Sequence, residues 1–207
     1  MNAPRWLTDT SPGHSERYIE RFRRMAEDGA DLVGEARLLD AMVGRGSLLL
    51  DAGCGPGRLG GYLHSVGHQV YGVDVDPVLI AAAEADHPGP RWRTGDLTEL
   101  DLRDDAGERL TFDGIICAGN VMVFLAEGTE AVVLGRLADH LADDGVLLVG
   151  FHTDRELSIA DFDVAVDQAG LRRDHRFATW DLHPWHDDAD FVVTVLRKGR
   201  PRKEIQS

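Results

Sequence analysis

Apolar and polar residues alternate along the chain in blocks that predict strands and helices in turn. Short continuous apolar runs are typical of strands buried on both faces, whereas apolar residues three and four apart indicate one face of a helix. Seven segments predict strands: SLLLDAG (47–53), QVYGVD (69–74), RWRTGD (91–96), FDGIICAG (112–119), VLLVGF (146–151), LRRDHRFATW (171–180) and DFVVTVLRK (190–198).

Helical spacing fills most of the gaps between these strands. The predicted helical stripes are Leu59, Leu63 and Val66; VLIAAAEA (78–85); Val133, Leu137 and Leu141; and Phe162, Ala165, Val166 and Ala169. Their predicted N-terminal caps are Asp76 followed by Pro77, Thr129, and Ser158 with Asp161 three residues later. Gly67 and Gly145 are the expected stops of the first and third of these helices.

This alternation predicts an α/β fold with a doubly wound sheet, because parallel strands are joined by right-handed helical crossovers. No helical pattern separates the last two segments, so a closing hairpin should make the last of seven strands antiparallel. Extra helices precede this core, and Tyr18, Phe22 and Met25 form one stripe there. That segment either packs on the sheet or forms a lid over a ligand crevice. We expect one structural domain with an N-terminal extension (1–44), a core (45–198) and a basic tail (199–207).

Composition and charge disfavour several classes of binding partner. The 207 residues suit a single domain, and a formal net charge of −14 disfavours nucleic acids and anionic membranes as broad partners. No apolar run approaches the ~20 residues needed to cross a bilayer, and the N-terminus lacks a signal-type apolar core. Cys54 and Cys117 have neither metal nor disulfide spacing. We therefore expect a cytoplasmic protein without a metal site.

The turn after the first strand, Asp51-Ala-Gly53-Cys-Gly55-Pro-Gly57, is the main chemical signal. In open parallel sheets, ligands bind beyond the carboxyl ends of the strands, where this turn lies. A phosphate-binding P-loop would need a following Lys, which is absent. A dinucleotide fingerprint counted from Gly53 would need a third glycine where Arg58 stands. Phosphoryl transfer is disfavoured, and a pyrophosphate cradle matches poorly.

The chain resembles the class I S-adenosylmethionine-dependent methyltransferases at several places in order. The resemblance lies in LLLDAGCGPGRLGGYL, YGVDVD, TGDLTEL, FDGIICAGNVMVFL and LADDGVLLVGF. It covers residues 45–155, and the last two strands fit the family's closing hairpin. It implies a Rossmann-like fold, S-adenosylmethionine as cofactor and S-adenosylhomocysteine as product.

The resemblance also implies which residues hold the cofactor: Asp51, Gly53, Cys54, Gly55, Gly57, Asp74, Val75, Asp96, Leu97 and Ala118. Asp51 would place negative charge near the ammonium and sulfonium groups, and Asp74 would accept hydrogen bonds from the ribose hydroxyls. Asp96, or the backbone of Leu97, would bind adenine, and the Ala118 carbonyl would accept from the ammonium. Asp51 and Asp96 could instead serve only to cap turns.

The sequence gives weaker evidence for the residues that would contact the methyl acceptor. His152 follows the fifth strand and is a candidate general base, and Asn120 could orient an acceptor. His14, His183 and His186 are weaker candidates, and two histidines in one loop are slight evidence for a metal.

Aromatic residues predicted near the crevice favour a small apolar or aromatic acceptor; they are Phe124, Phe151, Trp180 and Trp185. Methyl transfer to a small molecule by in-line displacement is therefore the leading hypothesis. A non-catalytic S-adenosylmethionine-binding regulator and a nicotinamide-dependent oxidoreductase are the alternatives.

Overall fold

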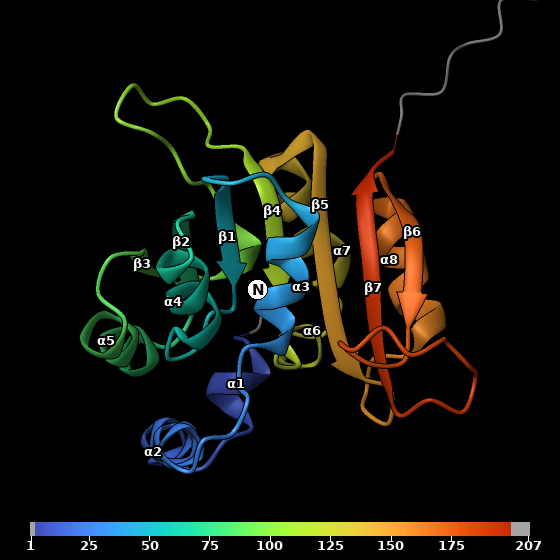
Figure 1. Ribbon diagram of the computed structural model, residues 1–207. Coiled ribbons are helices and arrows are strands. Elements are labelled where there is room, and N and C mark those ends of the chain that lie inside the picture. The colour runs from blue at the N-terminus through green and yellow to red at the C-terminus, as the bar shows by residue number, and fades with distance from the viewer. Residues whose placement is uncertain (1–2, 200–207) are drawn as a thin grey trace, which may run out of the picture.

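The computed structural model describes residues 3–199, so nearly all of the predicted basic tail lies outside the described residues. Seven strands form one sheet in the order β3-β2-β1-β4-β5-β7-β6 (Figure 1). Their bounds are β1 Leu48–Ala52, β2 Gln69–Asp74, β3 Arg91–Thr94, β4 Phe112–Cys117, β5 Leu141–His152, β6 Leu171–Phe177 and β7 Phe191–Lys198. β1 to β5 are mutually parallel, and β7 runs antiparallel to both β5 and β6. The predicted α/β sheet with an antiparallel last strand is confirmed.

Helices cover both faces of this sheet (Figure 1). Their bounds are α1 Arg5–Thr8, α2 His14–Glu27, α3 Gly34–Met42, α4 Arg58–Ser65, α5 Pro77–Asp86, η1 Leu97–Glu99, α6 Val121–Phe124, α7 Glu130–His140 and α8 Ile159–Gln168. Neighbouring side chains of a strand point to opposite faces, so Leu50 packs in the core under α7 and α8, while Leu49 packs under α3 and α4. Burial on both faces explains the continuous apolar runs of β1 and β4.

The sheet reverses its strand order between β1 and β4, which pair in parallel beside each other. β1 continues outward to β2 and β3, and β4 continues the other way to β5. The carboxyl ends of β1, β2 and β4 therefore meet at one edge, which is the switch point where such sheets bind ligands. α1 and α2 lie beyond this edge (Figure 1).

The predicted caps of two helices are confirmed. The Asp76 carboxylate accepts a hydrogen bond from the N–H of Val78 at the start of α5, at 2.8 Å. The Ser158 hydroxyl accepts from the N–H of Asp161 at the start of α8, at 3.1 Å. Thr129 does occupy the N-cap position of α7, but its hydroxyl donates to the Ala126 carbonyl instead of capping the helix.

Two local predictions are wrong. α7 ends at His140 instead of near Gly145, because the backbone of Leu141 already pairs with Phe112 in the sheet. Leu141 is buried in either arrangement, so its apolar character did not reveal the boundary. In α2 the buried face carries Ile19 rather than Met25, which is exposed.

Candidate functional site

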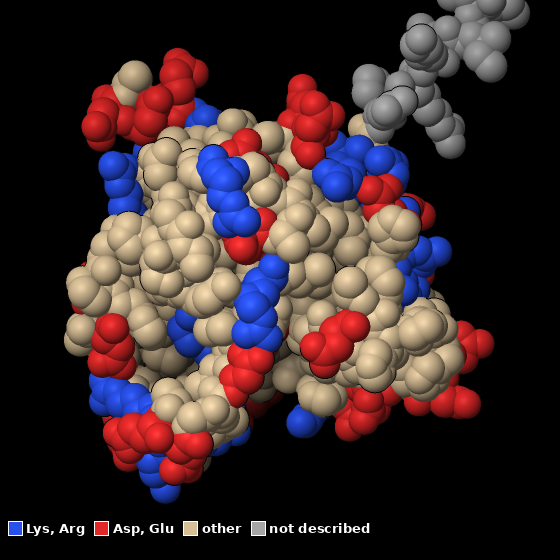
Figure 2. Space-filling model, viewed as in Figure 1, with Lys and Arg blue, Asp and Glu red and all other residues tan. Residues whose placement is uncertain are grey.

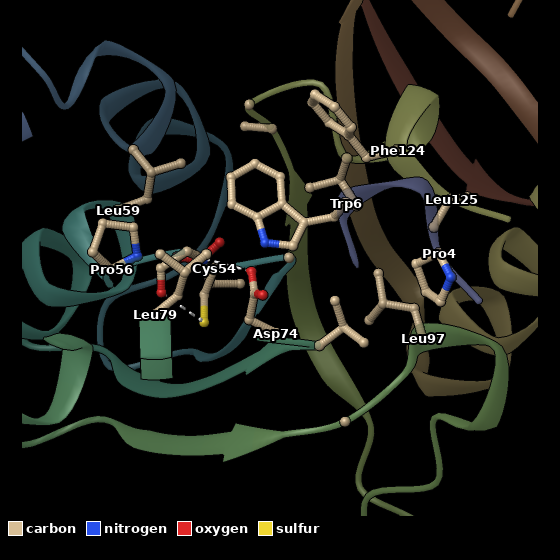
Figure 3. Close-up of a pocket in the computed structure, with 18 of the residues that line it drawn as sticks. Pro4, Trp6, Cys54, Pro56, Leu59, Asp74, Leu79, Leu97, Phe124 and Leu125 are labelled. Atoms are coloured by element: carbon tan, nitrogen blue, oxygen red, sulfur yellow. Dashed lines mark hydrogen bonds between the residues drawn. The ribbon is translucent and has the colours of Figure 1, made fainter. Parts of the chain in front are cut away.

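An open cavity lies at the switch point of the sheet (Figure 3). Its walls come from the turn after β1, the ends of β2 and β4, the segment after β3, and the N-terminal segment. Every lining residue lies between positions 4 and 125. All of the predicted cofactor residues except Gly57 line this cavity, so the structure brings nine of the ten together.

The glycine-rich turn has a backbone that few other residues could adopt. Gly53 has φ of +77°, and a Cβ there would overlap the side chain of Val121. Gly55 has φ of +54°, and its N–H donates to the carboxylate of Asp74 at 2.8 Å. Gly57 lies outside the lining and serves packing, because a Cβ there would lie 2.8 Å from the Cβ of Ala83.

Two buried carboxylates face the cavity. Asp51 is 2% exposed and accepts a hydrogen bond from the N–H of Gly60 at 2.9 Å. Burial raises the pKa of Asp51 to about 7, against the partial opposition of that hydrogen bond and of Arg58. Burial also raises the pKa of Asp74. A ligand that brings positive charge or hydroxyl donors would relieve this cost, as the ammonium and ribose of S-adenosylmethionine would do.

The segment after β3 adds Asp96 and Leu97 to the cavity wall. One oxygen of Asp96 accepts from both the N–H and the hydroxyl of Thr98, each at 2.8 Å, so this residue also caps η1. The turn-capping role and the cavity-lining position therefore occur together. Cys54 also lines the cavity, and burial raises the pKa of its thiol well above the usual value, which fits a packed residue and not a nucleophile.

The N-terminal segment forms one wall of the cavity, through Pro4, Trp6 and Tyr18. Trp6 projects into the space between Asp74 and Phe124 (Figure 3). The sequence offered the helix that carries Tyr18 as a lid, as one of two alternatives. It did not single out Pro4 and Trp6, because the short segment around α1 has no helical periodicity.

Arg58 is the one basic side chain among the lining residues of the described chain. Its guanidinium donates to both carboxylate oxygens of Glu35, at 3.1 and 2.6 Å, and to the carbonyl of Leu32. These contacts use three of the five N–H donors of an arginine. The pattern of the turn had marked Arg58 only as an obstacle to a dinucleotide.

His152 and Asn120 lie together but outside the lining of the cavity. The side-chain oxygen of Asn120 accepts from the backbone N–H of His152 at 2.8 Å, which joins the ends of β4 and β5. The His152 ring lies 3.1 Å from the carbonyl of Asp190 and packs edge-on to Phe191. Their catalytic roles stay a prediction.

The remaining aromatic and histidine candidates divide between the cavity and other places. Phe124 lines the cavity. Phe151 and Trp185 pack in the core under α7 and α8, and Trp180 packs against Gly150 on the opposite face.

His14 packs edge-on to Trp6, with ring centroids 4.8 Å apart, so it does reach the N-terminal wall. His183 and His186 lie on the exposed segment between β6 and β7. Within residues 3–199, no three His, Cys, Asp or Glu side chains are grouped so as to hold a metal ion.

Comparison with known proteins decides the family. A TehB-like SAM-dependent methyltransferase from Corynebacterium glutamicum is 43% identical over 91% of this chain and 100% of its own, with a TM-score of 0.85. The chain belongs to the S-adenosylmethionine-dependent methyltransferases. A family described as a methyltransferase domain also matches residues 49–145 of this methyltransferase.

Two more distant relatives extend the comparison. A malonyl-[acyl-carrier protein] O-methyltransferase from Pectobacterium atrosepticum is 29% identical over 143 residues, which are 68% of this methyltransferase. The same 143 residues are 53% of that protein, so the chain spans about half the length of this curated relative. The Burkholderia thailandensis 1,6-didemethyltoxoflavin-N1-methyltransferase is 20% identical over 97% of this chain and 94% of its own, with a TM-score of 0.61. That likeness shows the fold.

The cofactor of this methyltransferase is S-adenosylmethionine, and it is an enzyme. The glycine turn, the two buried acids and Arg58 fit that cofactor, whose amino-acid end carries both a positive and a negative charge. Family membership sets aside the nicotinamide and non-catalytic alternatives. No helix among residues 3–199 has the length and apolarity of a membrane span.

Proposed function

We propose that this methyltransferase transfers a methyl group to a small-molecule acceptor that enters the outer half of the cavity. The observation that carries this proposal is the position and lining of that cavity. The cavity lies at the switch point of the sheet, where open parallel sheets bind small ligands. Trp6, Phe124 and Leu125 form an apolar wall opposite the acids, which suits an apolar or aromatic acceptor.

The residues present also support an assignment of cofactor contacts. Asp51 and the Ala118 carbonyl would face the ammonium group, Asp74 would hold the ribose, and the 96–97 segment would hold adenine. Arg58 would take the carboxylate, because no other base lines the cavity in the described chain. When bound, the cofactor supplies a methyl group on a sulfonium that an acceptor displaces in line. The chain supplies alignment and a wall that excludes water.

Surface charge supports a small partner over a polyanion. The segment between β6 and β7 carries four exposed acidic residues, Asp181, Asp187, Asp188 and Asp190. Figure 2 shows acidic side chains gathered over this end of the molecule. The net charge of −14 acts in the same direction. Two relatives named above have names that specify a malonyl carrier-protein conjugate and a toxoflavin precursor as their acceptors.

An acceptor that arrives protonated needs a base. His152 lies at the end of β5, next to the Asn120 that follows a cavity residue, Gly119. We keep His152 as the candidate base and Asn120 as the residue that holds the end of β5 in place. Once an acceptor is known, His152→Gln should lower kcat by about a hundredfold or more, the usual contribution of a general base; an unchanged kcat would exclude this role.

The first experiment is calorimetric titration with S-adenosylmethionine, S-adenosylhomocysteine and NAD in parallel. The first two should bind and NAD should not. The second experiment offers labelled S-adenosylmethionine with three acceptor pools: small apolar and aromatic molecules, cell proteins, and nucleic acids. Label transferred only to protein or nucleic acid would overturn the small-molecule proposal while leaving the cofactor assignment standing.

A further inference from the structure

One carboxylate outside the cavity lining connects the N-terminal segment to the site. Oδ2 of Asp76 accepts a hydrogen bond from the indole N–H of Trp6 at 2.8 Å and another from the hydroxyl of Ser15. Trp6 belongs to α1 and Ser15 to α2, so a single oxygen holds both helices. Asp76 is 5% exposed, and hydrogen bonds in such a dry position are hard to replace with water.

The carboxylate of Asp76 also caps a helix. Its other oxygen, Oδ1, caps α5 by accepting from the N–H of Val78 at 2.8 Å. Burial of Asp76 opposes its ionisation, but the hydrogen bonds from Ser15, Trp6 and the backbone outweigh burial and hold its pKa below the usual value. The ionised carboxylate of Asp76 is therefore the form that accepts the hydrogen bonds from Trp6 and Ser15.

Trp6 is held on its other sides by aromatic rings. It packs edge-on to Tyr18 and Phe124, with centroid separations of 5.4 Å in each case, and to His14. Arg5 beside it donates to the carbonyl of Val123 at 3.4 Å. The indole thus lies in the cavity wall between α2 and α6 and contacts both.

The backbone joins this contact to the cofactor site. The N–H of Asp76 donates to Oδ1 of Asp74 at 3.0 Å, and Oδ2 of Asp74 accepts from Gly55. Asp74 is the residue proposed to hold the ribose, and Asp76 is two positions further along the chain. One hydrogen bond therefore joins Asp74 directly to the residue that holds Trp6.

From this geometry we propose that Asp76 is a positioning residue that fixes Trp6 in the cavity wall, so that the N-terminal segment and the bound cofactor hold each other in place. The proposal rests on the cofactor contacts assigned under the proposed function. It predicts that the Trp6–Asp76 hydrogen bond slows the dissociation of the cofactor.

The experiment compares the dissociation rate of radiolabelled S-adenosylhomocysteine, in a chase with unlabelled ligand, for the wild type and three variants. Asp76→Asn keeps an oxygen for the cap of α5 but presents an N–H to the indole N–H of Trp6, which breaks that contact. The hydroxyl of Ser15 can still accept a hydrogen bond from the amide. Trp6→Phe keeps an aromatic wall without the donor. The third variant combines the two.

Each single variant should raise the dissociation rate about tenfold or more, the ratio expected from one hydrogen bond to a charged group. The double variant should be no faster than the faster single, because both changes remove the same contact. The matched control is Asp86→Asn, which breaks the exposed Arg23–Asp86 pair between α2 and α5 (2.9 Å) and should change the rate less than twofold.

Unchanged rates in both single variants would overturn the proposal, and so would multiplied effects in the double variant, which would mean two unrelated contacts. Amide hydrogen exchange at residues 4–9 in ligand-free protein gives a readout that needs no cofactor. Exchange there should quicken in Asp76→Asn and stay unchanged in Asp86→Asn. A wild type that fails to bind S-adenosylhomocysteine would refute the assigned contacts instead, and the exchange result would still decide whether Asp76 holds Trp6.

Discussion

Asp51 should release a proton when the cofactor binds. Burial raises its pKa to about 7 in the ligand-free protein, so near neutral pH a large share of the molecules carry a protonated Asp51. The ammonium group proposed to lie beside it would favour the carboxylate and lower that pKa, by about two units for an opposite charge at contact distance. Binding would then displace the proton to the solvent.

The size of the release follows from these two values. With the pKa falling from about 7 to about 5, binding releases about 0.8 proton at pH 6, about 0.5 at pH 7 and about 0.1 at pH 8. The dissociation constant should therefore be about ninefold higher at pH 6 than at pH 8. The sign is fixed, because only the ionised form is complementary to a cation.

Calorimetric titration of S-adenosylhomocysteine in two buffers with different ionisation enthalpies measures the released protons directly. Asp51→Asn keeps the oxygen that accepts from Gly60 but cannot titrate, so the release should vanish and the affinity should lose its dependence on pH. A residual release in this variant would belong to Asp74, whose pKa is also raised by burial. Equal release from wild type and variant, or none from the wild type at pH 6, would refute the placement of the ammonium beside Asp51.

Folding without the cofactor should show the opposite trend. The pKa of Asp51 rises from 3.8 to about 7 on folding, so the folded chain holds a proton that the unfolded chain gives up at lower pH. Its contribution to stability is present below about pH 4 and is lost as pH rises to about 7. Denaturant unfolding of wild type and Asp51→Asn over that range should therefore differ most at neutral pH, where the variant avoids a buried charge. A constant difference would contradict the raised pKa.

Three further outcomes are expected. Arg58→Gln should weaken S-adenosylhomocysteine binding about tenfold or more and leave binding of 5′-methylthioadenosine, which lacks the carboxylate, unchanged; equal losses in calorimetry would mean a structural role. Gly53→Ala should lower the free energy of unfolding by about 1–3 kcal/mol in denaturant titration, and Val121→Ala should recover part of this loss. Cys117 is fully buried, with its pKa raised by burial to about 12, so iodoacetamide should label it far more slowly in native protein than in urea.

Local patterns predicted the central strands well because β1, β2 and β4 are buried on both faces of the sheet. Such burial favours continuous apolar runs, and β2 matched the predicted segment, residues 69–74, at both ends. The boundary between α7 and β5 was missed because Leu141 is apolar in either element. What decides it is the pairing with Phe112, which lies 29 positions earlier in the chain and leaves no local trace.

The cofactor half of the site was predictable for a similar reason. A tight turn that needs positive φ requires glycines, and the acids stand directly at strand ends, so short stretches of sequence are enough to identify both. The helical stripe with Tyr18 was visible in the sequence as a possible lid, but the part of the wall formed by α1 was not predictable. α1 has only four residues and depends on contacts of Trp6 with segments some 70 and more positions away. Arg58 was visible but its role depended on Glu35, which only the folded chain brings close.

Because every residue that lines the cavity precedes position 126, the chain separates two tasks along its length. The final third completes the sheet through β5, β7 and β6 and carries the exposed, acid-rich segment between the last two strands. Substitutions, insertions or exchanges in that segment touch none of the described cavity walls. Natural or laboratory evolution can therefore change this exposed segment while every residue that lines the cavity stays the same.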